Sequence, residues 1–224
     1  MENLLFGICG KPGAGKDTIG SFLQNEYGFM IKTIKEPIEK AVSVVFGMSE
    51  HELYDRDARE LPLNNWPGWT TRKLLQGVAQ SMRDLVGEHI WGKILCDRIT
   101  SIVSCQTGRT RIVVPDVRTP GDVEQLRMCA AQNGMDFVLM MVTRPGHGSS
   151  TTGGFANHKL ESYDLTSSCS VLFANVGTIE QLNESVVSFM DGIKVYNSER
   201  QADFDIFKQI IMAIIDDKKS MVVE

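Results

Sequence analysis

The segment Gly10-Lys-Pro-Gly-Ala-Gly15-Lys16-Asp17-Thr18 has the residue types and the spacing that hold a polyphosphate. It fits the pattern G-x-x-x-x-G-K, follows an apolar run at residues 4–9 and opens a helical pattern at residues 16–27. Glycines let backbone N–H groups close around phosphate oxygens, and the N-terminus of the helix adds positive potential. A lysine at this position bridges the β- and γ-phosphates. We therefore expect ATP to bind at Gly13, Ala14, Gly15, Lys16, Asp17 and Thr18, with Lys16 also serving catalysis.

Asp17 departs from the usual loop, in which Ser or Thr follows the lysine and its hydroxyl ligates Mg²⁺. A carboxylate is a hard oxygen ligand, which can hold the ion directly or through water. Alternatively, Asp17 only favours the positive end of the helix, and Thr18 or water serves the metal. The first interpretation makes Asp17 the metal ligand of an ATP–Mg²⁺ site.

A second group of charged residues stands where another strand pattern ends, in Arg111-Ile-Val-Val-Pro-Asp116-Val-Arg118. Asp116 is suited to hold a Mg²⁺-bound water or a substrate group, and Arg118 is suited to neutralise a phosphoryl group during transfer. The competing interpretation is that Asp116 caps the following helix. Arg144 follows a further strand pattern and is a candidate catalytic residue that reaches ATP.

The stretch between the second and third strand patterns carries further cations and aromatics, among them Arg56, Arg72 and Trp91. A kinase whose acceptor is itself a phosphate must bring two polyanions together, and arginines offset the repulsion between them. Single surface arginines are usually solvated, so spacing alone leaves Arg56 and Arg72 undecided. Trp91 lies in a helical pattern, where an aromatic side chain is more often part of the core than a stacking surface for a base.

Short apolar runs alternate with helical patterns along the chain. We expect strands at residues 4–9, 29–34, 111–114, 137–142 and 170–174, and helices at residues 16–27, after Gly121 and after Thr178. Continuous apolar strands of this kind are typical of a parallel sheet buried on both faces, in which ligands bind at the carboxyl ends of the strands. The pattern predicts one α/β domain over residues 1–224.

Three segments stand outside this alternation. Residues about 35–100 read as a helical insertion with irregular stretches, and residues about 144–162 read as a lid loop rich in Gly, Ser and Thr. A helical insertion and a flexible lid both belong beside a site that closes. At residues about 203–217 we expect a C-terminal helix, which either packs on the core or forms a homodimer surface.

The composition argues against several classes of protein. The 224 residues are 42% hydrophobic, which suffices for a substantial core. With 23 Lys plus Arg against 28 Asp plus Glu, the net charge is −5, which argues against direct nucleic-acid binding along a broad basic face. No apolar run approaches the roughly 18 residues that span a bilayer. The first residues lack a basic n-region, so we expect a cytoplasmic protein with no membrane partner.

Six segments, taken in chain order, resemble the deoxynucleoside monophosphate kinases of T-even-type bacteriophages: GKPGAGKDT, WTTRKLLQ, IWGKIL, IVVPDVR, VTRPG and FANVGTIEQL. The likeness runs from about residue 4 to about residue 190, and GKDT is the form of the loop found in that family. The resemblance implies a parallel-sheet P-loop NTPase fold of the nucleoside monophosphate kinase type, with a helical acceptor-binding insertion and a flexible lid. It also implies that Arg56, Arg72, Trp91, Asp116 and Arg118 line a deoxynucleotide pocket.

The activity implied by this resemblance is transfer of phosphate from ATP, with Mg²⁺, to a deoxynucleoside monophosphate. The expected acceptors are dGMP and dTMP, and the expected location is the host cytoplasm if the chain is phage-encoded. The residues themselves leave two alternatives open. One is a P-loop kinase of another small metabolite, such as a nucleoside or dephospho-coenzyme A, and the other is a non-catalytic nucleotide-sensing module.

Overall fold

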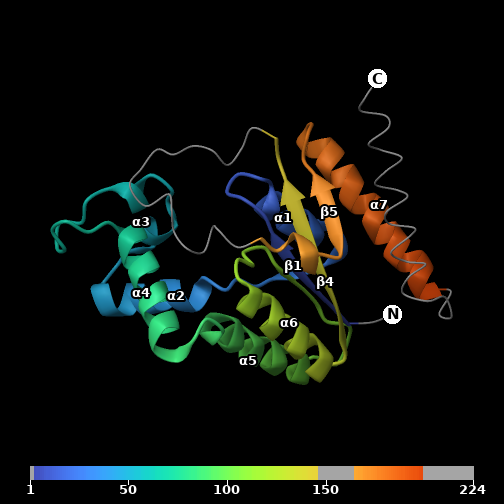
Figure 1. Ribbon diagram of the computed structural model, residues 1–224, viewed down its shortest axis with the longest axis horizontal. Helices are drawn as coiled ribbons and strands as arrows, with labels where there is room; N and C mark the ends of the chain where they lie inside the picture. The colour runs from blue at the N-terminus through green and yellow to red at the C-terminus, as the bar shows by residue number, and fades with distance from the viewer. Residues whose placement is uncertain (1–2, 146–163, 199–224) are drawn as a thin grey trace.

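Five strands form one parallel sheet in the computed structural model, which describes residues 3–145 and 164–198, with residues 194–198 described by their backbone alone. The strands lie in the order β2–β3–β1–β4–β5, and each neighbouring pair is parallel (Figure 1). Their bounds are β1 (Asn3–Cys9), β2 (Met30–Ile31), β3 (Arg111–Val114), β4 (Met135–Thr143) and β5 (Val171–Ala174). The predicted α/β fold with a parallel sheet is therefore confirmed.

Helices connect the strands, and several of them begin or end at a residue suited to cap a helix. Thr119 and Asp122 form a capping box at the start of α6, with Pro120 in the first turn. α1 ends at Gly28, whose φ of 68° is left-handed. The helices are α1 (Lys16–Tyr27), α2 (Glu36–Phe46), α3 (Glu50–Tyr54), η1 (Ala58–Glu60), α4 (Thr71–Val86), α5 (Ile90–Cys105), α6 (Pro120–Gln132), η3 (Thr166–Ser168) and α7 (Ile179–Ser198).

The central strand β1 sends alternate side chains to the two faces of the sheet. Leu4, Phe6 and Ile8 belong to a core that α1 and α7 cover. Leu5 and Cys9 belong to a second core, on the face covered by α5 and α6. Each of these side chains is at most 4% exposed. Burial on both faces explains why the apolar run of this strand is continuous.

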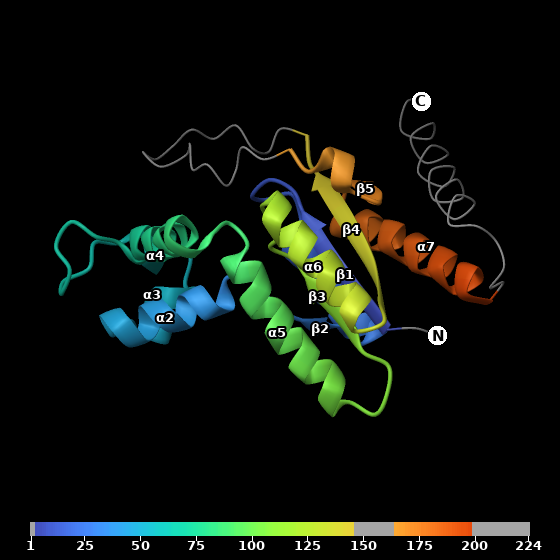
Figure 2. The same ribbon diagram turned by 60° about the horizontal axis from the view of Figure 1, so that its bottom comes forward.

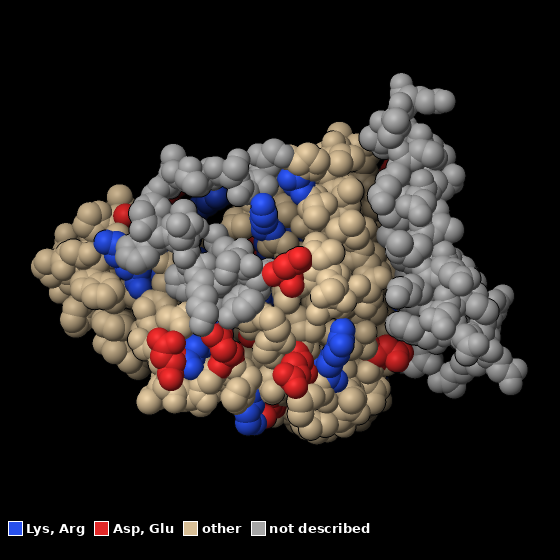
Figure 3. All heavy atoms as spheres, viewed as in Figure 1, with Lys and Arg blue, Asp and Glu red and all other residues tan. Residues whose placement is uncertain are grey.

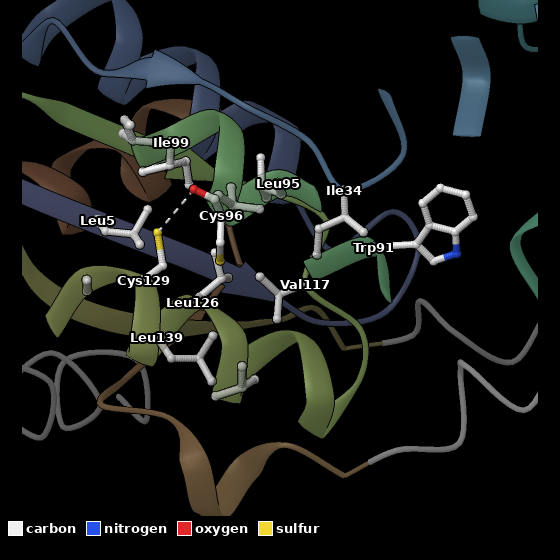
Figure 4. Packing of buried hydrophobic residues seen from close by; sticks show 14 of the residues in the cluster. Leu5, Ile34, Trp91, Leu95, Cys96, Ile99, Val117, Leu126, Cys129 and Leu139 are labelled. Atoms are coloured by element: carbon white, nitrogen blue, oxygen red, sulfur yellow. Dashed lines mark hydrogen bonds between the residues drawn. The ribbon is translucent and has the colours of Figure 1, made fainter. Parts of the chain in front are cut away.

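α5 and α6 lie side by side on the second face of the sheet (Figure 2). Trp91, Leu95 and Ile99 recur every four residues along α5 and are buried in this core. Figure 4 shows the packing of the cluster, with Cys129 of α6 contacting the backbone carbonyl of Cys96 in α5. α5 therefore packs on the sheet, although its residues fall within the range of about 35–100 expected for the insertion.

The segment from α2 to α4, which we call the helical arm (residues 36–86), stands to one side of the sheet (Figures 1 and 2). It has a small core of its own, made by Val42, Met48, Leu53, Leu63 and Leu74. A short apolar cluster of this kind lets the arm hold its own shape while it remains attached to the sheet at its two ends.

A buried ion pair reinforces the helical arm. Glu39 of α2 is 4% exposed, and its Oε1 lies 2.8 Å from Nη2 of Arg59 in η1. Arg59 also donates through Nε to the carbonyl of Leu53. Because a buried carboxylate is costly unless it is paired, this contact ties α2 to the turn that follows α3.

The strand expected at residues 29–34 is shorter than predicted, since β2 contains only Met30 and Ile31. Lys32 N–H still bonds to the carbonyl of Val113. Beyond it, the N–H groups of Ile34 and Lys35 donate to a side chain and not to a neighbouring strand. The chain leaves the sheet at this point because its donors are taken by that side chain.

Two predicted segments lie outside the described residues. Of the lid expected at about 144–162, only residues 144 and 145 are described, and the C-terminal helix expected at about 203–217 is not described. Both therefore remain predictions. Among the helices of the described ranges, none combines the length and the apolar character that crossing a bilayer requires.

We predict that Phe6→Ala lowers the free energy of unfolding by about 3–5 kcal/mol, because it opens a cavity in the core below β1. The Phe6 ring is fully buried, and its centroid lies 4.7 Å from that of Phe29 and 5.8 Å from that of Phe189. Denaturant unfolding followed by circular dichroism measures the change. Leu85→Ala is the control, since Leu85 is 79% exposed and should shift stability by less than about 0.5 kcal/mol. Equal losses in the two variants would contradict this assignment of the core.

Candidate functional site

The strand order creates a topological switch point at β1, because β3 lies on one side of it and β4 on the other. In open parallel sheets, ligands bind outside the carboxyl ends of the strands at such a point. The segment that joins the end of β1 to the start of α1, residues 10–15, stands there. The predicted phosphate loop therefore occupies the place where this class of fold binds ligands.

Glycines let the phosphate loop follow a path that other residues cannot take. Gly10, Gly13 and Gly15 have φ values of 138°, 77° and 109°. A Cβ atom added at Gly10 would lie 2.2 Å from the carbonyl oxygen of Val142, and one added at Gly15 would lie 2.8 Å from Nδ2 of Asn175. The glycine spacing thus has a steric cause, since the loop backbone approaches the ends of β4 and β5 too closely for side chains.

The first turn of α1 presents backbone N–H groups at the end of the loop. Gly15 is the N-cap residue, and no side chain caps the helix. In the part of the chain that the structure describes, the N–H of Gly15 donates to no backbone acceptor. Asp17 is exposed and Thr18 half-buried in this turn. Uncapped N–H groups and the positive end of the helix dipole are suited to bind an anion.

Lys16 folds back over the loop. Its ammonium group donates to the carbonyl oxygens of Gly10 at 2.8 Å and Lys11 at 2.9 Å. The N–H of Ala14 also donates to the carbonyl of Lys11, at 3.2 Å. The lysine therefore spans the loop through carbonyl groups and holds a positive charge at its mouth.

Several predicted site residues act on the charge of Lys16. Burial lowers the pKa of Lys16 below its ordinary value of 10.5, and the nearby Arg118 guanidinium lowers it further. The carboxylates of Asp17 and Asp116 act on this pKa in the opposite direction. The fold thus brings Lys16, Asp17, Asp116 and Arg118 into one electrostatic group.

Asp116 makes a contact that neither of the two sequence-based alternatives, a site ligand and a helix cap, includes. Its two carboxylate oxygens accept hydrogen bonds from the N–H groups of Ile34 at 2.9 Å and Lys35 at 3.0 Å. Burial raises the pKa of Asp116, although these donors and Arg118 favour the charged form. The helix that follows is capped by Thr119 and not by Asp116. Asp116 therefore joins the end of β3 to the start of the helical arm, and no bound water or substrate is needed to explain its position.

Arg118 and Arg144 are exposed and follow β3 and β4, at the same edge of the sheet as the phosphate loop. In the space-filling view, the Lys and Arg side chains in the upper half of the face shown have few Asp or Glu side chains beside them, whereas in the lower half Lys and Arg are interspersed with Asp and Glu (Figure 3). The upper half is the side toward which the arrows of β4 and β5 point (Figure 1). Basic side chains near the carboxyl ends of the strands are therefore less closely matched by acidic ones on this face than those in the lower half.

Arg56 and Arg72 both lie on the helical arm. Arg56 is exposed in the turn between α3 and η1, and Arg72 lies in the first turn of α4. The Nε of Arg72 is paired with the carboxylate of Glu60 in η1. Both partners of this pair are exposed, so that an anion of higher charge can compete with Glu60 for the guanidinium.

Trp91 does not lie where a base could stack on it. Its side chain is 3% exposed, and the indole Nε1 donates to the carbonyl of Ala79 at 3.0 Å. Figure 4 shows the ring beside Ile34, at the edge of the cluster between α5, α6 and the sheet. This corrects the pocket-lining role that the family resemblance implies, because helical spacing on α5 turns Trp91 toward the core.

Two contacts are not predicted from the sequence, one at the phosphate loop and one within the helical arm. One is the hydrogen bond of 2.8 Å from Nδ2 of Asn175 to the carbonyl of Ala14, and the other is the ion pair between Glu39 and Arg59. The position of Asn175, directly after an apolar strand, gives a signal for the first. The second has a weaker signal, an acidic residue on the apolar face of α2 beside Ile38 and four residues after Lys35.

The candidate metal ligands are few. In the described ranges, no three His, Cys, Asp or Glu side chains are grouped so as to hold a metal ion. Mg²⁺ usually keeps several waters and binds through one or two carboxylates together with phosphates. Asp17 is exposed beside Lys16 and suits this chemistry, whereas both oxygens of Asp116 already accept backbone hydrogen bonds.

No protein-family model matches the chain. A protein of Acanthamoeba polyphaga mimivirus, named "Putative deoxynucleotide monophosphate kinase", is 27% identical over 205 residues, which cover 87% of this chain and all of that protein. Among solved structures, the APS kinase CysC of Mycobacterium tuberculosis in complex with AMPPNP and APS matches with a TM-score of 0.48 and 12% identity. Shikimate kinase from Aquifex aeolicus matches with a TM-score of 0.44 and 10% identity. Each covers 85% of this chain and 98% of the solved one.

The lowered pKa of Lys16 predicts an alkaline loss of MgATP affinity. In the free protein Lys16 loses its proton below pH 10.5, and a bound polyphosphate draws the proton back. Affinity should therefore be constant near neutral pH, then fall as pH rises through the lowered pKa, with proton uptake on binding in that range. By the same linkage, the charged form of Lys16 is less favourable in the free folded state than in the unfolded chain and lowers the free energy of unfolding. This destabilisation is lost as pH rises through the lowered pKa toward 10.5.

Calorimetric titration with MgATP in two buffers of different ionisation enthalpy measures both the affinity and the proton uptake. Lys16→Arg is the control, because a guanidinium stays charged over this whole range of pH. The variant should bind more weakly but without proton uptake. An identical alkaline decline in wild type and variant would assign the titration to another group.

Proposed function

We propose that the chain transfers the γ-phosphoryl group of ATP to the phosphate of a deoxynucleoside monophosphate, forming a deoxynucleoside diphosphate and ADP. The observation that carries the proposal is the phosphate loop at the switch point of the sheet, with Arg118 close enough to Lys16 to add to the lowering of its pKa by burial. The mimivirus relative, which this chain matches over its full length, carries the name of a kinase for this class of acceptor.

The donor end of the proposed site is the loop itself. Gly13, Ala14 and Gly15 supply backbone around the β- and γ-phosphates of ATP, and Lys16 spans them. Asp17 and Thr18, in the first turn of α1, are the groups that would hold a metal ion carried by the nucleotide. Mg²⁺ at Asp17 would neutralise charge on the phosphates of ATP.

The acceptor end of the proposed site lies toward the helical arm. Arg118 stands on the sheet edge, and Arg56 and Arg72 stand on the arm. Two polyanions repel each other strongly when water is excluded, so a phosphate acceptor requires cations on both sides of the reacting oxygen. Arg72 is available for this role because the pair that it forms with Glu60 is exposed.

In the proposed reaction an oxygen of the acceptor phosphate attacks the γ-phosphorus in line. A new P–O bond forms to the acceptor, the bond between the γ-phosphorus and the β–γ bridging oxygen breaks, and ADP leaves with that oxygen. The chain needs no covalent intermediate, since catalysis consists of positioning the two reactants and neutralising the charge on their phosphates. Lys16, Arg118 and Arg144 are the residues proposed to offset charge on the transferring group.

Turnover with a set of nucleotides tests the proposal directly. ADP release should appear with ATP, Mg²⁺ and a deoxynucleoside monophosphate, and we expect dGMP and dTMP to be the best acceptors. The ratio of kcat/KM for dGMP to that for GMP should be well above one. ATP binding with no ADP release for any monophosphate would favour a nucleotide-sensing module, and activity with nucleosides or dephospho-coenzyme A alone would favour another metabolite kinase.

Lys16→Ala should lower kcat by about 10²–10³, because loss of one contact to developing charge commonly has that effect. Lys93→Ala is the matched control, since Lys93 is an exposed lysine of α5 that pairs with Asp97. It should leave turnover unchanged. Near-normal turnover in the folded Lys16→Ala variant would show that the phosphate loop does not take part in the reaction.

Arg72→Ala should raise the KM for the acceptor severalfold and leave the affinity for MgATP nearly unchanged, because the phosphate loop binds ATP without the arm. Initial rates at varied acceptor concentration and a separate MgATP titration measure the two effects. Arg127→Ala is the control, an exposed arginine of α6 whose guanidinium donates to the carbonyl of Ser168. Equal loss of ATP and acceptor affinity in Arg72→Ala would place Arg72 outside the acceptor site.

A further inference from the structure

We propose that Asn175 is a positioning residue for the nucleotide phosphates, which acts by fixing the peptide between Ala14 and Gly15 in the phosphate loop. The inference rests on the proposed function in one respect, because it takes the ligand of the loop to be a nucleotide polyphosphate. It assigns to the end of β5 a role in binding that the loop motif alone does not contain.

The contact joins two parts of the chain that are far apart in sequence. Nδ2 of Asn175 donates to the carbonyl of Ala14 at 2.8 Å, across 161 positions. Asn175 is 8% exposed, so water does not compete freely for this bond. Ala14 is buried as well, at 2% exposure. A short hydrogen bond between two buried groups holds the loop to the sheet at this point.

The geometry of the peptide bond passes this constraint to the binding side of the loop. In a trans peptide the C=O and the following N–H point in nearly opposite directions. When Asn175 holds the carbonyl of Ala14, the N–H of Gly15 is directed away from Asn175. That N–H donates to no backbone acceptor within the described residues, so it remains available to a phosphate oxygen.

Steric contact strengthens the effect of the hydrogen bond. A Cβ atom at Gly15 would meet Nδ2 of Asn175 at 2.8 Å and Cδ2 of Leu182 at 3.1 Å. The carboxamide therefore lies against the loop backbone itself and limits its movement toward β5. In addition, the backbone N–H of Asn175 donates to the carbonyl of Thr143 at 2.7 Å, which fixes the carboxamide relative to β4.

The chemistry of this position suits an amide and not an acid. The bond to the carbonyl of Ala14 requires a donor, which an ionised carboxylate cannot supply. A carboxylate here would also bring negative charge close to the phosphates that the loop is proposed to bind. Asn175 supplies the donor and remains neutral.

Two measurements on the full chain test the inference. Hydrogen exchange at residues 10–18 of the free protein, measured by mass spectrometry of peptides, should be faster in Asn175→Ala than in wild type. The Kd for MgATP, measured by titration calorimetry without acceptor, should rise about tenfold, the size expected for loss of a buried hydrogen bond that orients a binding group. Asn175→Ser, which keeps a shorter donor, should give intermediate values for both and provides a second variant if Asn175→Ala folds poorly.

Asn133→Ala is the matched control. Nδ2 of Asn133 also donates to a backbone carbonyl at 2.8 Å, that of Cys129, but this residue precedes β4 at the opposite edge of the sheet. The control should lower thermal stability and leave both loop exchange and MgATP affinity unchanged. If folded Asn175→Ala behaves as Asn133→Ala does, the residue has only a structural role and the inference is overturned.

The same experiments separate this inference from the proposed function. If wild type binds MgATP but transfers phosphate to no deoxynucleotide, the proposed function fails while the Kd values still decide the role of Asn175. If wild type binds no MgATP, the proposed function fails at its first step and the assignment of Asn175 to phosphate binding fails with it. Unchanged exchange at residues 10–18 in the variants overturns the inference in every case.

Discussion

The phosphate loop must be held rigidly without use of the N–H groups that a phosphate needs. The structure meets this requirement by holding the loop through its carbonyl groups. The ammonium group of Lys16 bonds to the carbonyls of Gly10 and Lys11, and the carboxamide of Asn175 bonds to the carbonyl of Ala14. The carbonyls of Gly10 and Ala14, fixed in this way, orient the N–H groups of Lys11 and Gly15 in the opposite direction, whereas Lys11 is followed by Pro12, which has no N–H. The glycines, the order of the strands and the buried asparagine all serve this one constraint.

Charge is distributed differently on the two sides of the candidate site. On the helical arm, two arginines are paired with acidic neighbours, Arg59 with Glu39 and Arg72 with Glu60. At the sheet edge, burial and, after it, the nearby Arg118 guanidinium lower the pKa of Lys16, while the carboxylates of Asp17 and Asp116 act in the opposite direction. Keeping two cations near each other costs free energy in the free protein, and a bound polyanion recovers it. The net lowering of the Lys16 pKa makes the sheet edge a stronger candidate for the triphosphate than the arm.

Features that depend on the spacing of nearby residues could be predicted from the sequence. Side-chain environments that depend on contacts between distant parts of the chain could not. The glycine loop, the strand at residues 111–114 and the helix at residues 16–27 follow from patterns within a few residues, and the structure has the strand and the helix at those positions. Asp116 looks the same in sequence whether it faces a ligand or the backbone of Ile34, which lies 82 positions away. Trp91 is ambiguous for a similar reason. The helical spacing shows which face of α5 carries Trp91, but whether that face is buried is known only from the position of α6. Asn175 is a candidate by its position directly after an apolar strand, but nothing in the sequence indicates its partner, the carbonyl of Ala14, which lies 161 positions away.

The attachment of the helical arm to the sheet fixes the start of the arm relative to the phosphate loop, so that the two halves of the candidate site keep their relative positions. The chain enters the arm directly after Ile34 and Lys35, whose N–H groups are held by Asp116 at the end of β3. The residue after Asp116, Val117, donates in turn to the carbonyl of Ile8 in β1, at 3.2 Å, two residues before the phosphate loop. The start of the arm is thus fixed to the same strand ends that carry the loop. Because burial makes charge on Asp116 costly while its two backbone donors favour it, the strength of this attachment depends on both hydrogen bonds being made together. A displacement that breaks one of them weakens the other, so the two hydrogen bonds together hold the base of the arm in one position.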